Sequence, residues 1–145
     1  MIAALARWFA LPPGERGRTV EAAFYLLAVR LAFGLLQLPH ALRLMRIVQG
    51  EAGAGRIAAP EAQEVSRAIA RAARHVPFRA VCLQQAFAAL LMLRRRGLKA
   101  IVHLGLARED GSDALKAHAW SCCGEVAVTG VPQARGFVPV AAFTA

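Results

Sequence analysis

The chain has 145 residues, a formal net charge of +9 and a hydrophobic content of 57%, which fits a single domain with a sizeable core. Three cysteines, two of them adjacent, argue against a disulfide framework and indicate a reducing, cytoplasmic setting. The positive charge suits an acidic peptide or a membrane surface. Because no helix-turn-helix, RNA-binding or zinc-finger signature occurs, we expect no nucleic acid, metal or cofactor.

The first part of the chain predicts helices. Residues 1–10 are a short apolar lead-in, residues 11–14 form a turn, and residues 15–38 predict a strongly apolar helix. The run 20–38 has 19 residues, about the length that crosses a bilayer, but Glu21 and Arg30 interrupt it. A charge inside the apolar layer costs roughly 3 kcal/mol on insertion scales, so we expect a buried or membrane-surface helix and not a span.

Proline and glycine mark the boundaries that follow. Pro39 and His40 interrupt the helical pattern, and residues 41–48 predict a short basic amphipathic helix. Three glycines make residues 50–59 the best internal linker, and Pro60 suits the first turn of a helix that continues to His75. Pro77 lies in the loop after that helix.

The helix expected over residues 82–96 carries a cysteine at its start. Leu83, Phe87 and Leu90 follow helical spacing, three arginines fall in the last turn, and Gly97 is the expected stop. The unpaired N–H groups and the dipole at a helix N-terminus stabilise a thiolate, so Cys82 is placed to be a nucleophile. The alternative is that Cys82 is a small buried apolar residue, which is common for free cysteine.

After Gly97 the pattern changes to strands over residues 98–106, 115–122 and 125–129, with Cys123 and Gly124 as a tight turn. Pro132 and Pro139 make residues 131–145 an edge strand or a loop. The predicted class is therefore α+β: a helical region over residues 1–50 and a core over residues 60–145, a cysteine-bearing helix packed on a small antiparallel sheet. We expect the two parts to form one compact unit.

His118 and Trp120 form the second informative pair. Side chains two residues apart on a strand project from the same face, so the indole would shield the imidazole from water. An imidazole beside a thiol can take its proton and later protonate a leaving amine, which is the chemistry of cysteine acyl-transfer enzymes. The alternative is that His118 is a hydrogen-bonded strand residue and Trp120 a core residue.

These residues resemble a known family. A cysteine at a helix start, a helix ending in Arg-Gly, and an Ala-His-Ala-Trp strand before a glycine hairpin, all within about residues 77–130, are similar to the transglutaminase-like domain of lasso-peptide B proteins. The resemblance is closest to the stand-alone leader peptidase. It implies a papain-like fold, Cys82 as nucleophile and His118 as base. It also implies three partners: a ribosomally made precursor peptide, a separate leader-recognition protein and an asparagine-synthetase-like cyclase that closes the macrolactam.

The third catalytic residue departs from that family, which places an aspartate about a dozen residues after the histidine. Counting outward from the turn puts Thr129 opposite His118, and a one-residue change of the loop would substitute Val128 or Gly130. Thr129 is therefore the expected orienting residue. For the oxyanion, the backbone N–H of Cys82 is one expected donor, and Trp120, Gln84 or Gln85 is the second.

Three functions follow from these patterns. The first is a cysteine peptidase that removes the leader from a precursor peptide. The second is a catalytically weakened transglutaminase-like module of the same maturation assembly, which the missing aspartate favours. The third is a helical protein on a membrane surface, and the apolar segment over residues 15–38 leaves such a peripheral contact open.

Overall fold

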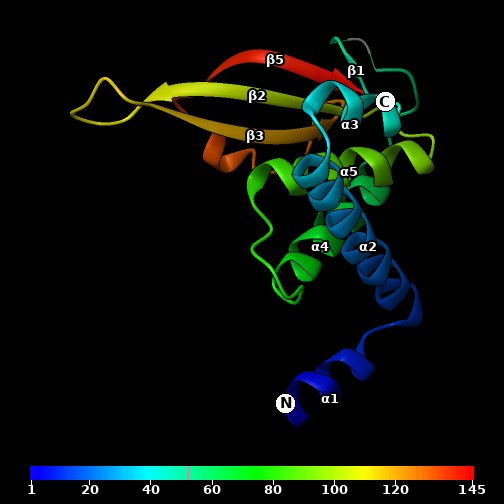
Figure 1. Ribbon diagram of the computed structural model, residues 1–145. Helices are drawn as coiled ribbons and strands as arrows, with labels where there is room; N and C mark the ends of the chain where they lie inside the picture. The colour runs from blue at the N-terminus through cyan, green and yellow to red at the C-terminus, as the bar shows by residue number, and fades with distance from the viewer. Residues whose placement is uncertain (52) are drawn as a thin grey trace.

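The computed structural model describes residues 1–51 and 53–145. Within these residues the chain forms an α+β fold in which helices cover one face of a five-stranded antiparallel sheet (Figure 1). The elements in chain order are α1 (Ile2–Ala10), α2 (Pro13–Leu35), α3 (Leu38–Leu44), β1 (Val48–Gln49), α4 (Ala59–Ala73), α5 (Cys82–Arg95), β2 (Ile101–Arg108), β3 (Leu115–Cys123), β4 (Val126–Thr129), the 3-10 helix η1 (Pro132–Ala134) and β5 (Val138–Thr144).

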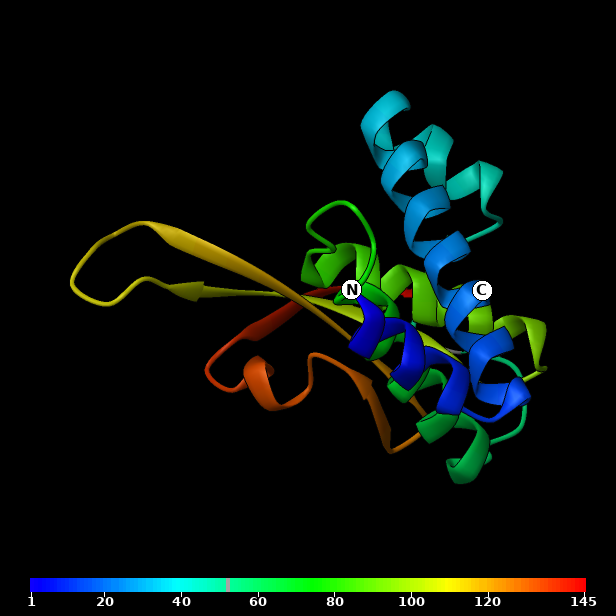
Figure 2. The same ribbon diagram turned by 90° about the horizontal axis from the view of Figure 1, so that it is seen from below.

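The sheet has the strand order β1-β5-β2-β3-β4. Its centre is the long β2–β3 hairpin, whose paired residues extend from Ile101 and Cys122 to Arg108 and Leu115. Both views show that the far end of this hairpin projects beyond the helices (Figures 1 and 2). The paired part near the helices carries His118 and Trp120. The projecting part does not contribute to the core.

Helix α5 lies at the centre of the hydrophobic core. Eight consecutive residues of α5, from Ala86 to Leu93, are buried, because helices and strands surround this part of the helix on all sides. Phe87 makes aromatic contacts with Phe33 of α2 and Phe143 of β5. The first helical region and the later core therefore share one hydrophobic cluster.

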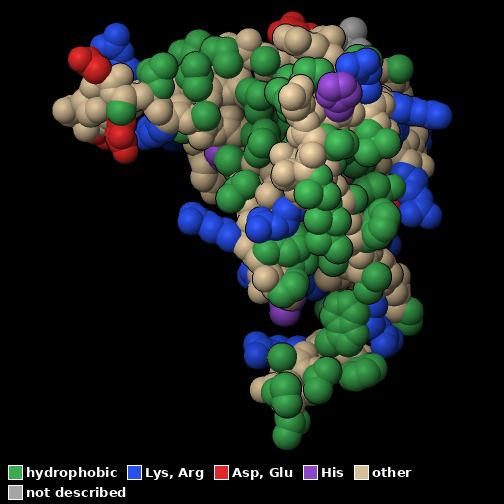
Figure 3. All heavy atoms as spheres, in the orientation of Figure 1, with side chains coloured by type: hydrophobic (Ala, Val, Ile, Leu, Met, Phe, Trp, Pro, Cys, Tyr) green, Lys and Arg blue, Asp and Glu red, His purple; other side chains and the backbone are tan. Residues whose placement is uncertain are grey.

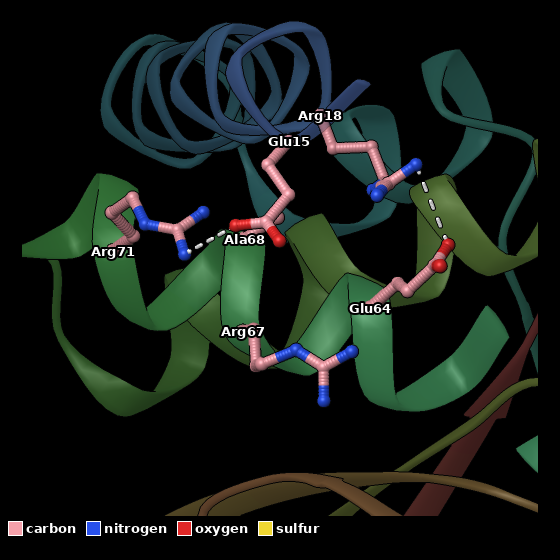
Figure 4. A pocket seen from close by; sticks show the side chains of 6 residues that line it. All are labelled: Glu15, Arg18, Glu64, Arg67, Ala68 and Arg71. Carbon is pink, nitrogen blue, oxygen red and sulfur yellow. Dashed lines mark hydrogen bonds and ion pairs between the residues drawn. The ribbon is translucent and has the colours of Figure 1, made fainter. Parts of the chain in front are cut away.

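Ion pairs add to this packing where α2 crosses α4 and α5. Glu15 pairs with Arg71 at 3.0 Å and Arg18 with Glu64 at 3.4 Å, both between α2 and α4. These four side chains and Arg67 line a small cavity of about 40 Å³ between the two helices (Figure 4). Its charges are largely paired with one another, so the cavity is part of the helix interface.

The α+β class and the main helices of the sequence analysis are confirmed, with two differences in the helical half. Residues 1–10, expected only as a lead-in, form α1. Residues 41–48, expected as a helix, are divided between the end of α3 and the strand β1. The break expected at Pro39 and His40 falls just before them, between α2 and α3, because proline is tolerated in the first turn of α3. The positive φ of Arg46, 54°, follows the end of α3. Ala52, within the predicted linker, lies outside the described residues.

Two expectations for the strands are corrected. The C-terminal segment is not only an edge: the end of β5 lies between β1 and β2. Pro139 is accommodated because β1 pairs only with Phe143 and Thr144, which leaves the outer side of β5 unpaired at the proline. The hairpin turn is also shifted by one residue, since Cys123 pairs with Val126 and the turn consists of Gly124 and Glu125.

None of the described helices is both long and apolar enough to cross a membrane, in agreement with the interrupted apolar run of α2.

Candidate active site

Cys82 is the first residue of α5, as its sequence context predicts. Its side chain is half-buried and packs against the edge of the core. Val81 precedes it with an extended backbone and no side-chain cap, so the first N–H groups of the helix are not used by a capping side chain. Gln85 donates from Nε2 to the carbonyl oxygen of Ala80 at 2.8 Å. This bond ties the preceding loop to the helix and positions the start of α5.

His118 lies on β3 and is half-buried. Its ring stacks on Trp120 with centroids 6.0 Å apart and lies 5.3 Å from the ring of Phe137, so the expected shared face of His118 and Trp120 is confirmed. The Nε2 atom lies 2.8 Å from the carbonyl oxygen of Gly130. A carbonyl oxygen only accepts, so Nε2 carries the hydrogen, and in the neutral ring the lone pair is on Nδ1.

Gly130 can make this contact because it has no side chain. Its φ of +66° is a left-handed conformation that side chains disfavour. A Cβ at this position would lie 2.9 Å from Nε2 of His118 and 2.8 Å from the carbonyl oxygen of Ala119. The backbone after β4 therefore approaches the imidazole more closely than any larger residue would allow.

The register shows how the ring is directed. Ala119 and Cys123 belong to the core that contains α5, whereas His118 and Trp120 alternate with them and project from the other face. In the described chain, β4 pairs with Ser121, Cys122 and Cys123 only, so the outer edge of β3 has no strand partner at His118. The bond to Gly130 draws the ring toward this edge, whereas α5, with Cys82 at its start, packs on the face of β3 that carries Ala119 and Cys123.

The structure thus brings together His118, Trp120 and Gly130, and places Cys82 and Gln85 at the start of α5. Within the described residues no hydrogen bond joins Cys82 to His118. The expected contact of Thr129 with His118 is wrong: Thr129 is paired with Ser121 and bonds its hydroxyl at 2.7 Å. The shifted turn and a bulge between Ser121 and Cys122 cause this difference.

A comparison with protein families finds a match over residues 25–142 to the family described as the transglutaminase-like superfamily. The chain belongs to this superfamily. No curated protein and no solved structure matches it. The matched region extends from α2 into β5 and includes Cys82, His118 and Gly130, while α1 lies before it.

Membership in the transglutaminase-like superfamily gives the domain a cysteine-peptidase-like fold.

The other two thiols occupy different surroundings from Cys82. Cys123 is fully buried in the core, and Cys122 is half-buried on the opposite face of β3, as strand alternation predicts. Burial, and to a lesser extent the neighbouring Cys123, raises the pKa of Cys122. The described residues contain no group of three metal-ligating side chains.

Sequence reasoning assigned the partner of His118 to a side chain and so missed the main-chain oxygen of Gly130 as the expected acceptor. Gly130 had appeared only as an alternative that a different loop length would bring opposite His118. The signal was present in the glycine that follows Thr129, since a glycine at the end of a strand often marks a close backbone approach. Phe137 was also missed, because nothing in its local pattern connects it to β3.

Proposed function

We propose that this transglutaminase-like protein is a cysteine peptidase that removes the leader from a ribosomally synthesised lasso precursor peptide before macrolactam closure. The observation that carries the proposal is the arrangement around His118: the Gly130 carbonyl holds Nε2–H, and Nδ1, which has no hydrogen-bond partner among the described residues, can act as a base. Cys82 complements it as the nucleophile, because it is the first residue of α5, where backbone N–H groups without a capping side chain can bind developing negative charge.

In the proposed reaction, Nδ1 of His118 takes the proton of the Cys82 thiol. The sulfur attacks the scissile carbonyl, and the N–H groups at the start of α5 face the oxygen that becomes negative. The imidazolium then protonates the leaving amine, and the C–N bond breaks to leave a thioester. Water, deprotonated by the same imidazole, attacks the thioester and releases the acid, so one peptide bond and one water become an acid and an amine.

Because the two groups are not hydrogen-bonded in the described chain, the proposal includes a closing movement on substrate binding. Catalytic hydrogen bonds are often loose in free enzymes and tighten only when substrate is bound. This movement would have to bring the imidazole and the start of α5 together, because His118 projects from the face of the sheet opposite the core that contains α5. A separate leader-recognition protein would deliver the precursor, and an asparagine-synthetase-like cyclase would take the freed core peptide.

The first test replaces Cys82 with alanine. The purified variant, mixed with precursor and recognition partner, should show no leader cleavage by mass spectrometry, a loss of at least about 10³-fold, because no other group supplies the nucleophile. Cys122→Ala is the matched control and should retain wild-type activity, because it removes a half-buried thiol that has no part in the proposed reaction. Normal cleavage by Cys82→Ala would reject the peptidase assignment.

The second candidate is a catalytically inert module of the same assembly. Two observations favour it: Cys82 and His118 are not bonded to each other, and the partner of His118 is a neutral carbonyl. Alkylation by iodoacetamide separates the candidates. An active site should label Cys82 near neutral pH, well before Cys122, whose raised pKa keeps it protonated until the pH rises above the ordinary thiol range. Equally slow labelling of the two thiols would support the inert module.

A further inference from the structure

The outer side of α2 carries a straight apolar stripe that no part of the described chain covers. Its members are spaced by three or four residues and are 45–79% exposed: Val20, Phe24, Leu27, Leu31 and Leu35. They lie on the opposite side of the helix from the buried residues Ala22, Leu26 and Val29. Monomeric proteins rarely leave a continuous apolar surface of this kind open to water unless something binds there.

Helix α1 extends the same surface. None of its nine residues is buried, and Ile2, Leu5 and Phe9 form a second exposed stripe. A helix this short is marginal in water on its own, so it needs an apolar surface to hold its conformation. In Figure 3 the hydrophobic side chains gather along α2 and continue down over α1, with arginine side chains at the margins.

The charges around this surface are of one sign. Arg7, Arg30, Arg43 and Arg46 are exposed on α1, α2 and the α3 segment. The two acidic residues of α2 point inward instead: Glu15 binds Arg71 of α4, and Glu21 binds Arg96 beyond α5, with side chains only 36% and 15% exposed. The described residues 1–50 therefore present apolar side chains and cations outward, and their carboxylates inward.

We infer that the α1–α2 surface docks on an anionic membrane surface. An interfacial helix of this kind buries its apolar face at the headgroup boundary while arginines contact anionic lipid. A second copy of the chain fits less well, because it would bring the same cations against one another. The surface also follows the outside of one helix and its extension, a convex shape that suits a deformable lipid layer. The site at Cys82 and His118 takes no part in this binding.

The test is co-sedimentation of the full chain with phosphatidylglycerol–phosphatidylcholine vesicles, compared with vesicles of phosphatidylcholine alone. The expected result is binding to the anionic vesicles that is at least about tenfold stronger than binding to the neutral vesicles. Binding to the anionic vesicles should fall as salt is raised, because exposed charges are screened. The triple variant Phe24→Gln, Leu31→Gln, Leu35→Gln should bind at least about tenfold more weakly than wild type.

The matched control is Leu115→Gln, Val138→Gln, Val140→Gln, which removes three apolar side chains of similar exposure, 58–66%, from the sheet. It should bind anionic vesicles within about twofold of wild type, because these residues lie outside the inferred surface. Melting temperatures of both variants establish that the fold is retained. No binding of wild type to anionic vesicles, or equal binding by the α2 variant, would overturn the inference. So would concentration-dependent dimerisation without vesicle binding, which would assign the surface to a second copy.

Discussion

At the scale of single residues, a backbone oxygen takes the place that a carboxylate often has beside a catalytic histidine. The Gly130 carbonyl fixes the ring and its tautomer, but it adds no full negative charge to stabilise an imidazolium. In the proposed reaction, the ring therefore donates Nε2–H to a neutral oxygen and not to a carboxylate.

Gly130→Ala tests this contact. The added Cβ would lie 2.9 Å from Nε2 of His118, so the ring must move, and the expected result is at least a tenfold loss of kcat for leader cleavage. The positive φ alone should cost about 1 kcal/mol of stability. Cleavage kinetics and thermal unfolding measure the two effects separately.

Gly111→Ala is the control for backbone strain, because Gly111 also has a positive φ, 75°, but nothing lies within 4 Å of its added Cβ. It should lose a similar amount of stability and keep full activity. If both variants lost activity equally, the contact between Gly130 and His118 would have no special role.

The residue-scale predictions from sequence succeeded where a local rule applies. The helix dipole and periodicity placed Cys82 at the start of α5, and strand alternation placed His118 and Trp120 on one face. The partner of His118 could not be predicted in the same way. It depends on a one-residue shift of the turn and on a bulge, which are decided by the packing of both strands and not by either one alone.

At the scale of elements, one carboxylate joins α2 to the end of α5. Both oxygens of Glu21 contact the guanidinium of Arg96, at 3.0 and 2.7 Å, with side chains 15% and 20% exposed. The hydrogen bond to Glu21, followed by their charge attraction, raises the pKa of Arg96. The start of α5 is the proposed site, so this bond at its other end helps to hold the whole helix in place.

Glu21→Gln should lower the free energy of unfolding by about 2 kcal/mol, because a partly buried, two-pronged charged hydrogen bond is lost and Arg96 keeps its charge. Denaturant unfolding measures the change. Asp113→Asn is the control, because its pair with Arg108 is fully exposed, with N and O atoms 3.7 Å apart, and should contribute almost nothing. Equal effects of the two changes would show that the partly buried pair contributes no more to the free energy of unfolding than the exposed pair.

Periodicity was sufficient for the long helices α2 and α4, because each buries one side and exposes the other. It was insufficient for α3, β1 and β5. These are short elements whose state depends on partners distant in sequence, such as the pairing of Val48 with Thr144. Local propensity has little weight in segments of two to seven residues.

At the scale of the whole molecule, the described residues form one hydrophobic core, and helix α1 lies outside it. The order of helices before strands was enough to predict the α+β class. The position of α1 could not be predicted, because its amphipathic sequence is equally compatible with burial against the core. Figure 1 shows α1 below the other helices, on the side that faces away from the sheet.

Deletion of residues 1–11 should therefore change the melting temperature by less than about 2 °C, because α1 contributes no buried residue to the core. The same deletion should weaken binding to anionic vesicles, since it removes Ile2, Leu5, Phe9 and Arg7 from the surface. Differential scanning calorimetry measures the first effect. A loss of 5 °C or more would mean that α1 packs on the core more than its exposure indicates.

The oxygen that holds His118 is part of the main chain, so no replacement of a side chain can delete it. The path of the backbone after β4 therefore determines the orientation of the imidazole. Residues that fix this path, such as Thr129 through its bond to Ser121, thereby influence a reaction that they never touch. A genetic screen for inactive variants should recover changes in this connecting segment that leave the thiol and the imidazole unaltered.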